Sequence, residues 1–163
     1  MISNIIDGLL ITISFTNIVN LLFGFVLGLT FGIIPGLNSI TAVLLVLPFA
    51  FGRNPESIFI ILVAAYCAAL YGGSVPAILF RTPGTSSAMM TSLDGYPLAK
   101  EGRAGEALAY SAIASGFGSI FGSIFLLFFT SWLAEFALSF GPFEYFSLAI
   151  FGMSAVTSLG RDN

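Results

Sequence analysis

The chain has 163 residues, of which 57% are hydrophobic and 8% are charged, and its formal net charge is −3 at pH 7. A water-soluble domain carries roughly 25% charged residues, so this composition indicates an integral membrane protein instead. The chain contains no His, which excludes Ser-His and Cys-His nucleophiles and His-based metal sites. We therefore predict no enzyme activity, no cofactor, no metal site and no nucleic-acid partner.

The apolar runs are continuous and lack the alternation that is typical of barrel strands. We therefore predict an all-α membrane protein with about four to five transmembrane helices. The N-terminal segment has no Lys or Arg before its apolar run and contains Asp7, which is not typical of a secretory signal peptide. The lone Cys67 lies in an apolar run, and we predict that it is buried as a small hydrophobic side chain.

The first helix is predicted from about Phe15 to Ile34, where the dipeptide Pro35-Gly36 interrupts it. The apolar segment that follows, 39–51, would form about 20 Å of helix. That length is short of the roughly 30 Å hydrocarbon core. We therefore predict one span and a half-helix that are joined at membrane depth, in a broken segment near 32–41. Such backbone is tolerated only when it is buried in protein or lines a cavity.

The next helix is predicted over 56–70, and a second broken segment, near 72–90, contains another Pro-Gly dipeptide. A polar loop is predicted over about 91–106, and its Lys and Arg residues favour a cytoplasmic location. Two more helices are predicted, over about 107–133 and 143–159. We interpret the whole chain, 1–163, as a single transmembrane domain that has one half of an inverted-repeat transporter.

Glycine recurs at every fourth position in the first helix, at Gly24, Gly28 and Gly32. Such a stripe lets two helices approach closely, because small residues serve helix packing in membranes. Gly118 and Gly122 repeat the spacing in the helix over 107–133. We predict that both stripes are helix-packing surfaces, while the same spacing also fits a sliding surface in a moving transporter.

The two broken segments have similar sequences, "GIIPGLNSIT" and "FRTPGTSSAM". In each, a Pro-Gly dipeptide precedes a small polar cluster that contains residues of the type that caps helices, Ser39 in the first and Ser86 and Ser87 in the second. The free N–H groups and the positive end of a helix dipole would then face an anion. Paired interruptions of this kind are the sequence signal of a transporter's binding site, whereas the alternative is a pair of simple kinks.

Arg81 lies next to the second Pro-Gly dipeptide, at the end of an apolar run. A guanidinium in such a segment usually faces a cavity or a partner, and its geometry suits a carboxylate. The alternative is that its side chain extends to the membrane surface. The first interpretation predicts a small anionic ligand at the broken segments.

The order of "GLTFGIIPGLNSITAVLLVLPFAF", "YGGSVPAILFRTPGTSS" and "TSLDGYPLAKEGRAGEAL" resembles the large membrane subunit of tripartite tricarboxylate transporters, the TctA family. The similarity covers roughly residues 15–160. It implies symport of carboxylates such as citrate across the bacterial inner membrane with a coupling cation, Na⁺ or H⁺. The implied partners are a small membrane subunit and a periplasmic substrate-binding protein. Family members are much longer, so this chain corresponds to their N-terminal portion.

Together, the resemblance and the residue patterns give a predicted substrate site of eleven residues, namely Pro35, Gly36, Asn38, Ser39, Gly73, Ser74, Arg81, Pro83, Gly84, Thr85 and Ser86. Asn is common in the family where this chain has Arg81, which points to a different selectivity or to a residue outside the pocket. The "DGYP" element, Asp94 to Pro97, is interpreted as a structural turn. The competing hypothesis is a non-transporting accessory subunit or a degenerate remnant.

Overall fold

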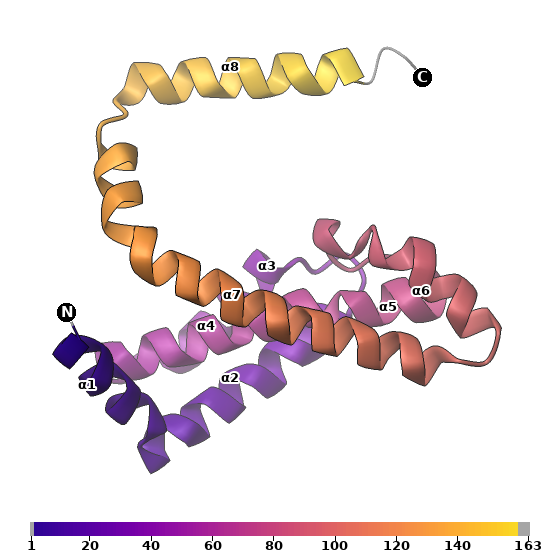
Figure 1. Ribbon diagram of the computed structural model, residues 1–163, viewed down its shortest axis with the longest axis horizontal. Helices are drawn as coiled ribbons and strands as arrows, with labels where there is room; N and C mark the ends of the chain where they lie inside the picture. Colours follow the sequence, from indigo (N-terminus) through magenta and orange to yellow (C-terminus); the bar gives the residue numbers. More distant parts are fainter. Residues whose placement is uncertain (1, 160–163) are drawn as a thin grey trace. The chain divides into compact units, whose positions relative to one another are not determined.

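The computed structural model describes residues 2–159, with side chains for residues 5–154, and every regular element in that part of the chain is helical. The prediction of an all-α protein is therefore confirmed. Figure 1 shows the elements in chain order, which are α1 (Ile2–Ile13), α2 (Phe15–Ile33), α3 (Ser39–Ala50), α4 (Pro55–Gly72), α5 (Ser74–Phe80), the 3₁₀ helix η1 (Ser86–Ala88), α6 (Thr91–Lys100), α7 (Ala104–Leu138) and α8 (Pro142–Leu159).

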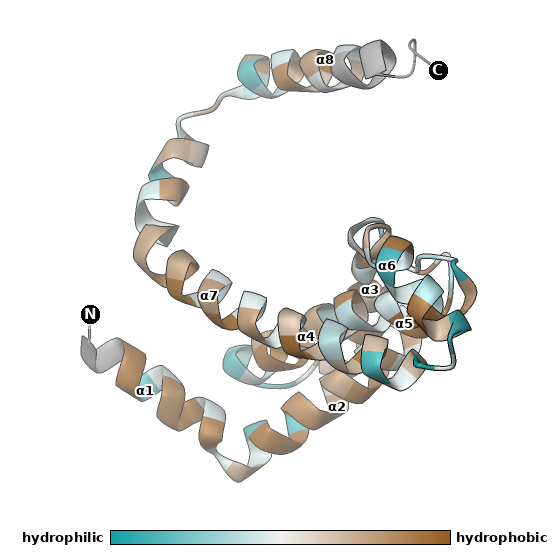
Figure 2. Cartoon of the chain, turned by 45° about the vertical axis from the view of Figure 1, so that its right-hand side comes forward, coloured by the Kyte–Doolittle hydropathy of each residue, from teal (hydrophilic) through white to brown (hydrophobic). Residues whose placement is uncertain are grey.

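Three helical stretches among the described residues are long and apolar enough to cross a membrane, namely Phe15–Ile33, Pro55–Phe80 and Ala104–Leu138. The second of them joins α4 and α5. The apolar helix α3 has only 12 residues, about 18 Å of helix, and matches the predicted half-helix. Figure 2 shows the apolar colouring along these helices.

The chain divides into two compact units, residues 1–116 and 117–163. A single transmembrane domain over the whole chain therefore stays a prediction. In the second unit, aromatic rings stack along α7, where the centroids of Phe125 and Phe129 are 4.2 Å apart. The described side chains of α8 are all exposed.

Helices α2 and α4 form the centre of the first unit and run parallel to each other. Gly24 lies against Ile61, Gly28 against Ala65 and Gly32 against Ala69, so the two helices stay in register over about two turns.

At each of these glycines an added Cβ would lie well under 3.0 Å from a backbone carbonyl oxygen of α4. Only glycine permits this approach of backbone to backbone. Gly24, Gly28 and Gly32 thus lie at the contact between α2 and α4.

The small apolar core lies where α3 covers this helix pair. Val46 and Ala50 of α3 pack with Ile61 and Ala65 of α4, and all four side chains are fully buried. Cys67 is exposed on α4, so the prediction that it is buried was wrong. Helix α4 buries a narrow stripe of mostly small residues, and Cys67 lies outside that stripe.

The prediction for the second glycine stripe has a different outcome. A Cβ added at Gly118 or Gly122 would meet no atom within 4 Å in the described part of the chain. Packing at these two positions therefore stays a prediction.

The segment predicted as a polar loop over 91–106 is largely helical, because α6 covers Thr91–Lys100. The "DGYP" element lies inside this helix, so its interpretation as a turn was wrong. Tertiary packing explains the difference, because a Cβ added at Gly95 would come within 2.8 Å of Ile78 on α5. The close contact holds α6 against α5 and overrides the weak local helix propensity of Gly and Pro.

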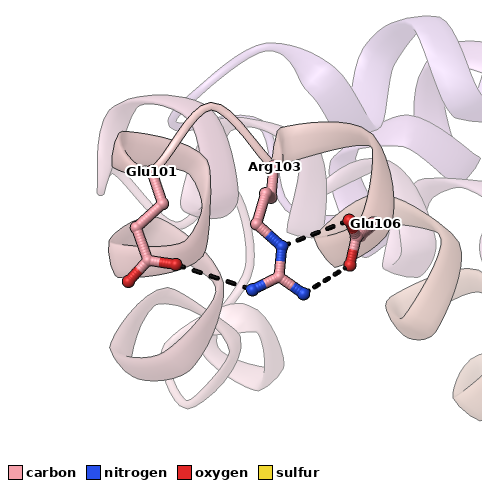
Figure 3. A network of polar contacts seen from close by, with 3 residues as sticks. All are labelled: Glu101, Arg103 and Glu106. Atoms are coloured by element: carbon pink, nitrogen blue, oxygen red, sulfur yellow. Dashed lines mark hydrogen bonds and ion pairs between the residues drawn. The ribbon is translucent and has the colours of Figure 1, made fainter.

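The turn between α6 and α7 is short and contains two ion pairs. Gly102 supplies a positive φ of 80°, a conformation that glycine adopts readily. Figure 3 shows Arg103 between two carboxylates, with Nη1 3.6 Å from Glu101 Oε2 and Nη2 2.7 Å from Glu106 Oε2. The hydrogen bond to Glu106 and its charge raise the pKa of Arg103 above its usual value. All three side chains are exposed.

Candidate functional site

The first interrupted segment turns the chain from α2 into α3. Pro35 and Gly36 follow the end of α2, and Gly36 has a positive φ of 93°, which glycine tolerates and other residues rarely adopt. The side-chain oxygen of Asn38 accepts hydrogen bonds from the Thr41 backbone N–H at 2.8 Å and from the Thr41 hydroxyl at 3.0 Å. Asn38 is therefore the N-cap of α3.

Ser39 was predicted as a residue of the capping type, but it is the first residue inside the helix and its side chain is buried. The cap belongs to Asn38 because that residue has the extended backbone conformation, with φ −78° and ψ 169°, that an N-cap requires. In the described part of the chain, the N–H groups of Ser39 and Ile40 donate no backbone hydrogen bond outside the helix. Such groups are typical of a helix start.

The second interrupted segment is a helical hairpin. The chain ends α4 at Gly72, continues as α5 and reverses at Arg81. On the return, the Thr82 N–H donates to the Pro76 carbonyl at 3.2 Å and the Gly84 N–H donates to the Gly73 carbonyl at 3.2 Å. Part of the backbone freed by this interruption is thus satisfied within the hairpin.

Four glycines pack the second interrupted segment against the last turn of α2, directly before the first interruption. We call Gly32, Gly72, Gly73 and Gly84 the glycine junction. A Cβ added at Gly84 would lie 2.9 Å from the Gly32 carbonyl oxygen and 3.0 Å from Gly73 Cα. A Cβ added at Gly72 would lie 3.1 Å from Gly32 Cα. Gly84 therefore has no room for a side chain at this junction, and the space at Gly72 is tight.

Two buried hydroxyl residues adjoin the glycine junction. Thr85 lies against Gly73, where an added Cβ would come within 2.7 Å of the Thr85 hydroxyl oxygen. Its hydroxyl is 3.0 Å from that of Ser87. Ser74 directly follows Gly73 and is also buried. The junction thus combines close backbone packing with small hydroxyl groups.

Ser86 and Ser87 were predicted as helix-capping residues, and this was wrong. Both are exposed and lie within the three-residue helix η1, and no side chain caps that helix with a hydrogen bond. The residue before η1 is Thr85, whose hydroxyl interacts with Ser87 instead. Among the described residues, the two polar clusters share no hydrogen bond with each other.

Arg81 directly follows the apolar stretch Pro55–Phe80. It ends α5 in the left-handed conformation, with φ 58° and ψ 24°. Its guanidinium carbon lies 5.9 Å from the ring centroid of Tyr96 on α6. The contact described for this side chain is thus with Tyr96, and a role in the predicted substrate site stays a prediction.

A polar cluster that we did not predict from the sequence lies at the opposite end of the α2–α4 pair. The Asn17 side-chain oxygen accepts hydrogen bonds from the Ser57 hydroxyl at 2.7 Å and from the Asn20 amide at 3.3 Å. The Asn20 oxygen accepts from Arg53 Nη1 at 2.6 Å, and the Asn17 amide donates to the Ile11 carbonyl at 2.8 Å. This α2–α4 polar cluster joins α1, α2, α4 and the turn before α4.

A signal for this cluster was present in the sequence. Asn17 and Asn20 continue the stripe of Gly24, Gly28 and Gly32 at spacings of three and four residues, which places all five on one face of a helix. The same face of α2 is buried throughout. Polar side chains on the packing face of an apolar helix point to a partner across the interface.

The fold and the site define a helical membrane protein with two interrupted segments, a feature that is typical of transporters. The profile of the Tripartite tricarboxylate transporter TctA family matches residues 18–163. The "Uncharacterized 52.8 kDa protein in TAR-I ttuC' 3'region" of Agrobacterium vitis is 38% identical over 161 residues. That alignment covers 99% of this chain and 32% of the relative, so the chain spans about a third of the relative's length.

No solved structure matches the chain. Because the family profile covers most of the chain, the protein belongs to the TctA family. The predicted resemblance to this family is confirmed.

Proposed function

We propose that the chain is the N-terminal part of a secondary transporter that takes up tricarboxylates or related carboxylates such as citrate, and that the substrate binds beside the glycine junction. The observation that carries this proposal is the packing of the second interrupted segment, at Gly84, on the carbonyl of Gly32 in the last turn of α2, directly before the first interruption. Membership of the TctA family supports a tricarboxylate as the substrate. A transporter of this kind binds substrate where broken helices meet.

The chemistry of the surrounding groups supports an anionic substrate. The N–H groups at the start of α3 lie at the positive end of its dipole, which favours a carboxylate. The hydroxyls of Ser39, Ser74 and Thr85 are donors on buried residues. Asn38 and Ser86 add polar groups, and Pro35, Gly36 and Pro83 shape the turns. Arg81 is left out of this proposal because its guanidinium contacts Tyr96.

The remaining parts of the proposal rest on the family. A tripartite transporter has further subunits, and we assign to them a small membrane subunit and a periplasmic substrate-binding protein. The assembly lies in the bacterial inner membrane and couples uptake to Na⁺ or H⁺. The chain aligns with 32% of its relative, so the rest of the substrate site comes from outside these 163 residues.

The test is uptake of labelled citrate by the whole assembly that contains this chain, with matched threonine variants. Thr85→Val removes a buried hydroxyl at the junction, and we expect at least tenfold slower uptake, because a hydrogen bond to a charged group contributes about 1.5–3 kcal/mol. The control is Thr30→Val on α2, whose hydroxyl is exposed and donates to the Val26 carbonyl at 2.7 Å. Its uptake should stay within about twofold.

Both variants are compared at equal protein levels in the membrane. Equal uptake by Thr85→Val and Thr30→Val would place the substrate elsewhere. If the unmodified assembly transports no carboxylate while Gly118→Leu, on the glycine stripe of α7, releases a partner subunit, the chain is an accessory subunit that acts through helix packing.

A further inference from the structure

Two cationic side chains meet at one aromatic ring where α6 packs on α5. The guanidinium carbon of Arg81 is 5.9 Å from the ring centroid of Tyr96, and Lys100 Nζ is 5.2 Å from the same centroid. Both distances are within the range of cation–π interactions. Tyr96 and Lys100 are four residues apart and share one face of α6, whereas Arg81 comes from the end of α5.

Neither cation is neutralised by the part of the chain that the structure describes. The ion pairs found there both belong to Arg103, and neither Arg81 nor Lys100 donates a side-chain hydrogen bond among the described contacts. Asp94 also lies on α6, but about 200° around the helix from Tyr96. Two like charges near one ring repel each other, and an anion between them would remove that repulsion.

The backbone at Arg81 holds its side chain in this place at an energetic cost. Arg81 is the only non-glycine residue with a positive φ in the described range 2–159. A left-handed conformation is unfavourable for a residue with a Cβ and persists where the surrounding structure enforces it. The hairpin supplies that constraint, because the Arg81 N–H donates to the Ala77 carbonyl at 3.2 Å and the Thr82 N–H to Pro76.

Arg81 and Lys100 lie between two candidate membrane spans, where the chain is expected to reach the membrane surface. Arg81 directly follows the apolar stretch Pro55–Phe80, and α6 precedes the next such stretch, Ala104–Leu138. The segment between them therefore connects two candidate spans. Tyr is enriched at the level of the lipid headgroups, and Arg and Lys extend toward that level from an apolar stem.

Apolar side chains are exposed on the same connecting segment. Met89, Met90 and Leu93 are 58%, 74% and 57% exposed. Cationic and aromatic groups together with exposed apolar side chains are typical of a segment that lies in the membrane interface. A soluble anion would use the cations alone, whereas a lipid would also contact the apolar side chains.

We propose that Arg81, Tyr96 and Lys100 bind the phosphate group of an anionic phospholipid, whose acyl chains contact Met89, Met90 and Leu93. The guanidinium donates hydrogen bonds to the phosphate oxygens, and the ammonium adds a second positive charge. The site is separate from the glycine junction, and it does not depend on the proposed transport function.

The test measures lipid binding to the 163-residue chain by native mass spectrometry. Phosphatidylglycerol and phosphatidylcholine with identical acyl chains are titrated separately, and the apparent Kd of the first bound lipid is determined. We expect the double variant R81Q/K100Q to bind phosphatidylglycerol about thirtyfold more weakly, since each cation near a lipid surface contributes about a factor of five. Binding of phosphatidylcholine, in which the choline cation compensates the phosphate charge, should change by less than about threefold.

The matched control is R53Q/R103Q, which removes the same amount of charge elsewhere. It should bind phosphatidylglycerol within about threefold of the unmodified chain, because Arg103 is already paired with carboxylates and Arg53 belongs to the α2–α4 polar cluster. Equal losses in the two double variants would show a general charge effect and overturn the proposal. So would unchanged binding in R81Q/K100Q.

A competition arm separates a lipid from a free anion. Inorganic phosphate at about 10 mM should leave phosphatidylglycerol bound, and displacement by it would identify a soluble anion site instead. If circular dichroism shows that R81Q/K100Q has lost helicity, the single variants Arg81→Gln and Lys100→Gln replace it. Each should weaken binding about fivefold, and normal binding in both would overturn the proposal.

Discussion

Helices α2 and α7 both place glycines four residues apart, but the two stripes differ in their surroundings. Gly24, Gly28 and Gly32 of α2 lie against backbone atoms of α4. Gly118 and Gly122 of α7 have no atom within 4 Å of an added Cβ in the described part of the chain. The four-residue spacing of glycines therefore allows another helix to approach closely. Whether a helix packs there depends on the surface that lies opposite the glycines.

The partner of α2 shows what a matching surface requires. Helix α4 presents Ala65 and Ala69 opposite the glycines, so that small residues meet small residues. The polar cluster at one end and the glycine junction at the other then hold the pair in one register. These fixed ends favour stable packing over the alternative of a sliding surface.

The largest expected effect is at the centre of this packing. Gly28→Leu places a side chain onto the Ala65 carbonyl, and we expect a loss of about 3 kcal/mol or more in the free energy of unfolding, because neither backbone can move away. Gly118→Leu is the matched control and should change stability by less than about 0.5 kcal/mol in the chain alone. Unfolding by denaturant in detergent measures both.

Equal losses for Gly28→Leu and Gly118→Leu would contradict the difference between the two stripes. The effect of Gly118→Leu can also be measured in the complete assembly. If Gly118→Leu is harmless in the chain but disrupts the assembly, the stripe on α7 packs against a part of the transporter outside these 163 residues.

The polar end of the α2–α4 pair should give the next largest effect. Asn17→Ala leaves the Ser57 hydroxyl and the Asn20 amide without their acceptor, and we expect a loss of about 1–2 kcal/mol. A double-mutant cycle with Ser57→Ala measures the coupling, which should be about 1 kcal/mol. Additive effects would mean that the hydrogen bond contributes nothing to the packing.

The hairpin that closes the junction gives a smaller effect. Arg81→Gly and Arg81→Ala both remove the contact with Tyr96, but only glycine accepts a φ of 58° without strain. Arg81→Gly should therefore be more stable than Arg81→Ala by about 1 kcal/mol. Thermal unfolding of the two variants in the same detergent tests this, and equal stability would show that the left-handed conformation is not retained.

The smallest expected effect concerns the start of α3. Asn38→Ala removes the cap that accepts from the Thr41 N–H, and we expect a loss of about 0.5–1 kcal/mol. Ser39→Ala serves as the control and should cost less, because that side chain caps nothing. A larger loss for Ser39→Ala than for Asn38→Ala in a denaturant titration would show that Ser39 is the N-cap.

Local chemistry made much of the fold predictable from sequence. Pro35 and Gly36 end α2 because Pro lacks an N–H and Gly36 takes a positive φ of 93°, and neither property depends on distant residues. The predicted half-helix after them has the expected extent, Ser39–Ala50. Long-range contacts were less predictable, as with the helix that runs through the "DGYP" element. There Gly95 packs on Ile78 of α5, which no local pattern reveals.

The candidate site divides in the same way. The paired Pro-Gly segments were visible as two interruptions, but the hairpin at Arg81 and the hydrogen bond from Gly84 to Gly73 depend on the reversal of the chain. The direction of the Arg81 side chain toward Tyr96 follows from that reversal.

Composition and backbone restrictions act locally, and for that reason the sequence was enough to predict an apolar helical protein of the TctA family that is interrupted at two Pro-Gly dipeptides. The meeting of Gly32, Gly73 and Gly84 at one end of two parallel helices depends on contacts between distant parts of the chain and was visible only in the fold. A glycine stripe can pack against any helix face that has small side chains. Which face it contacts depends on the tertiary fold of the chain.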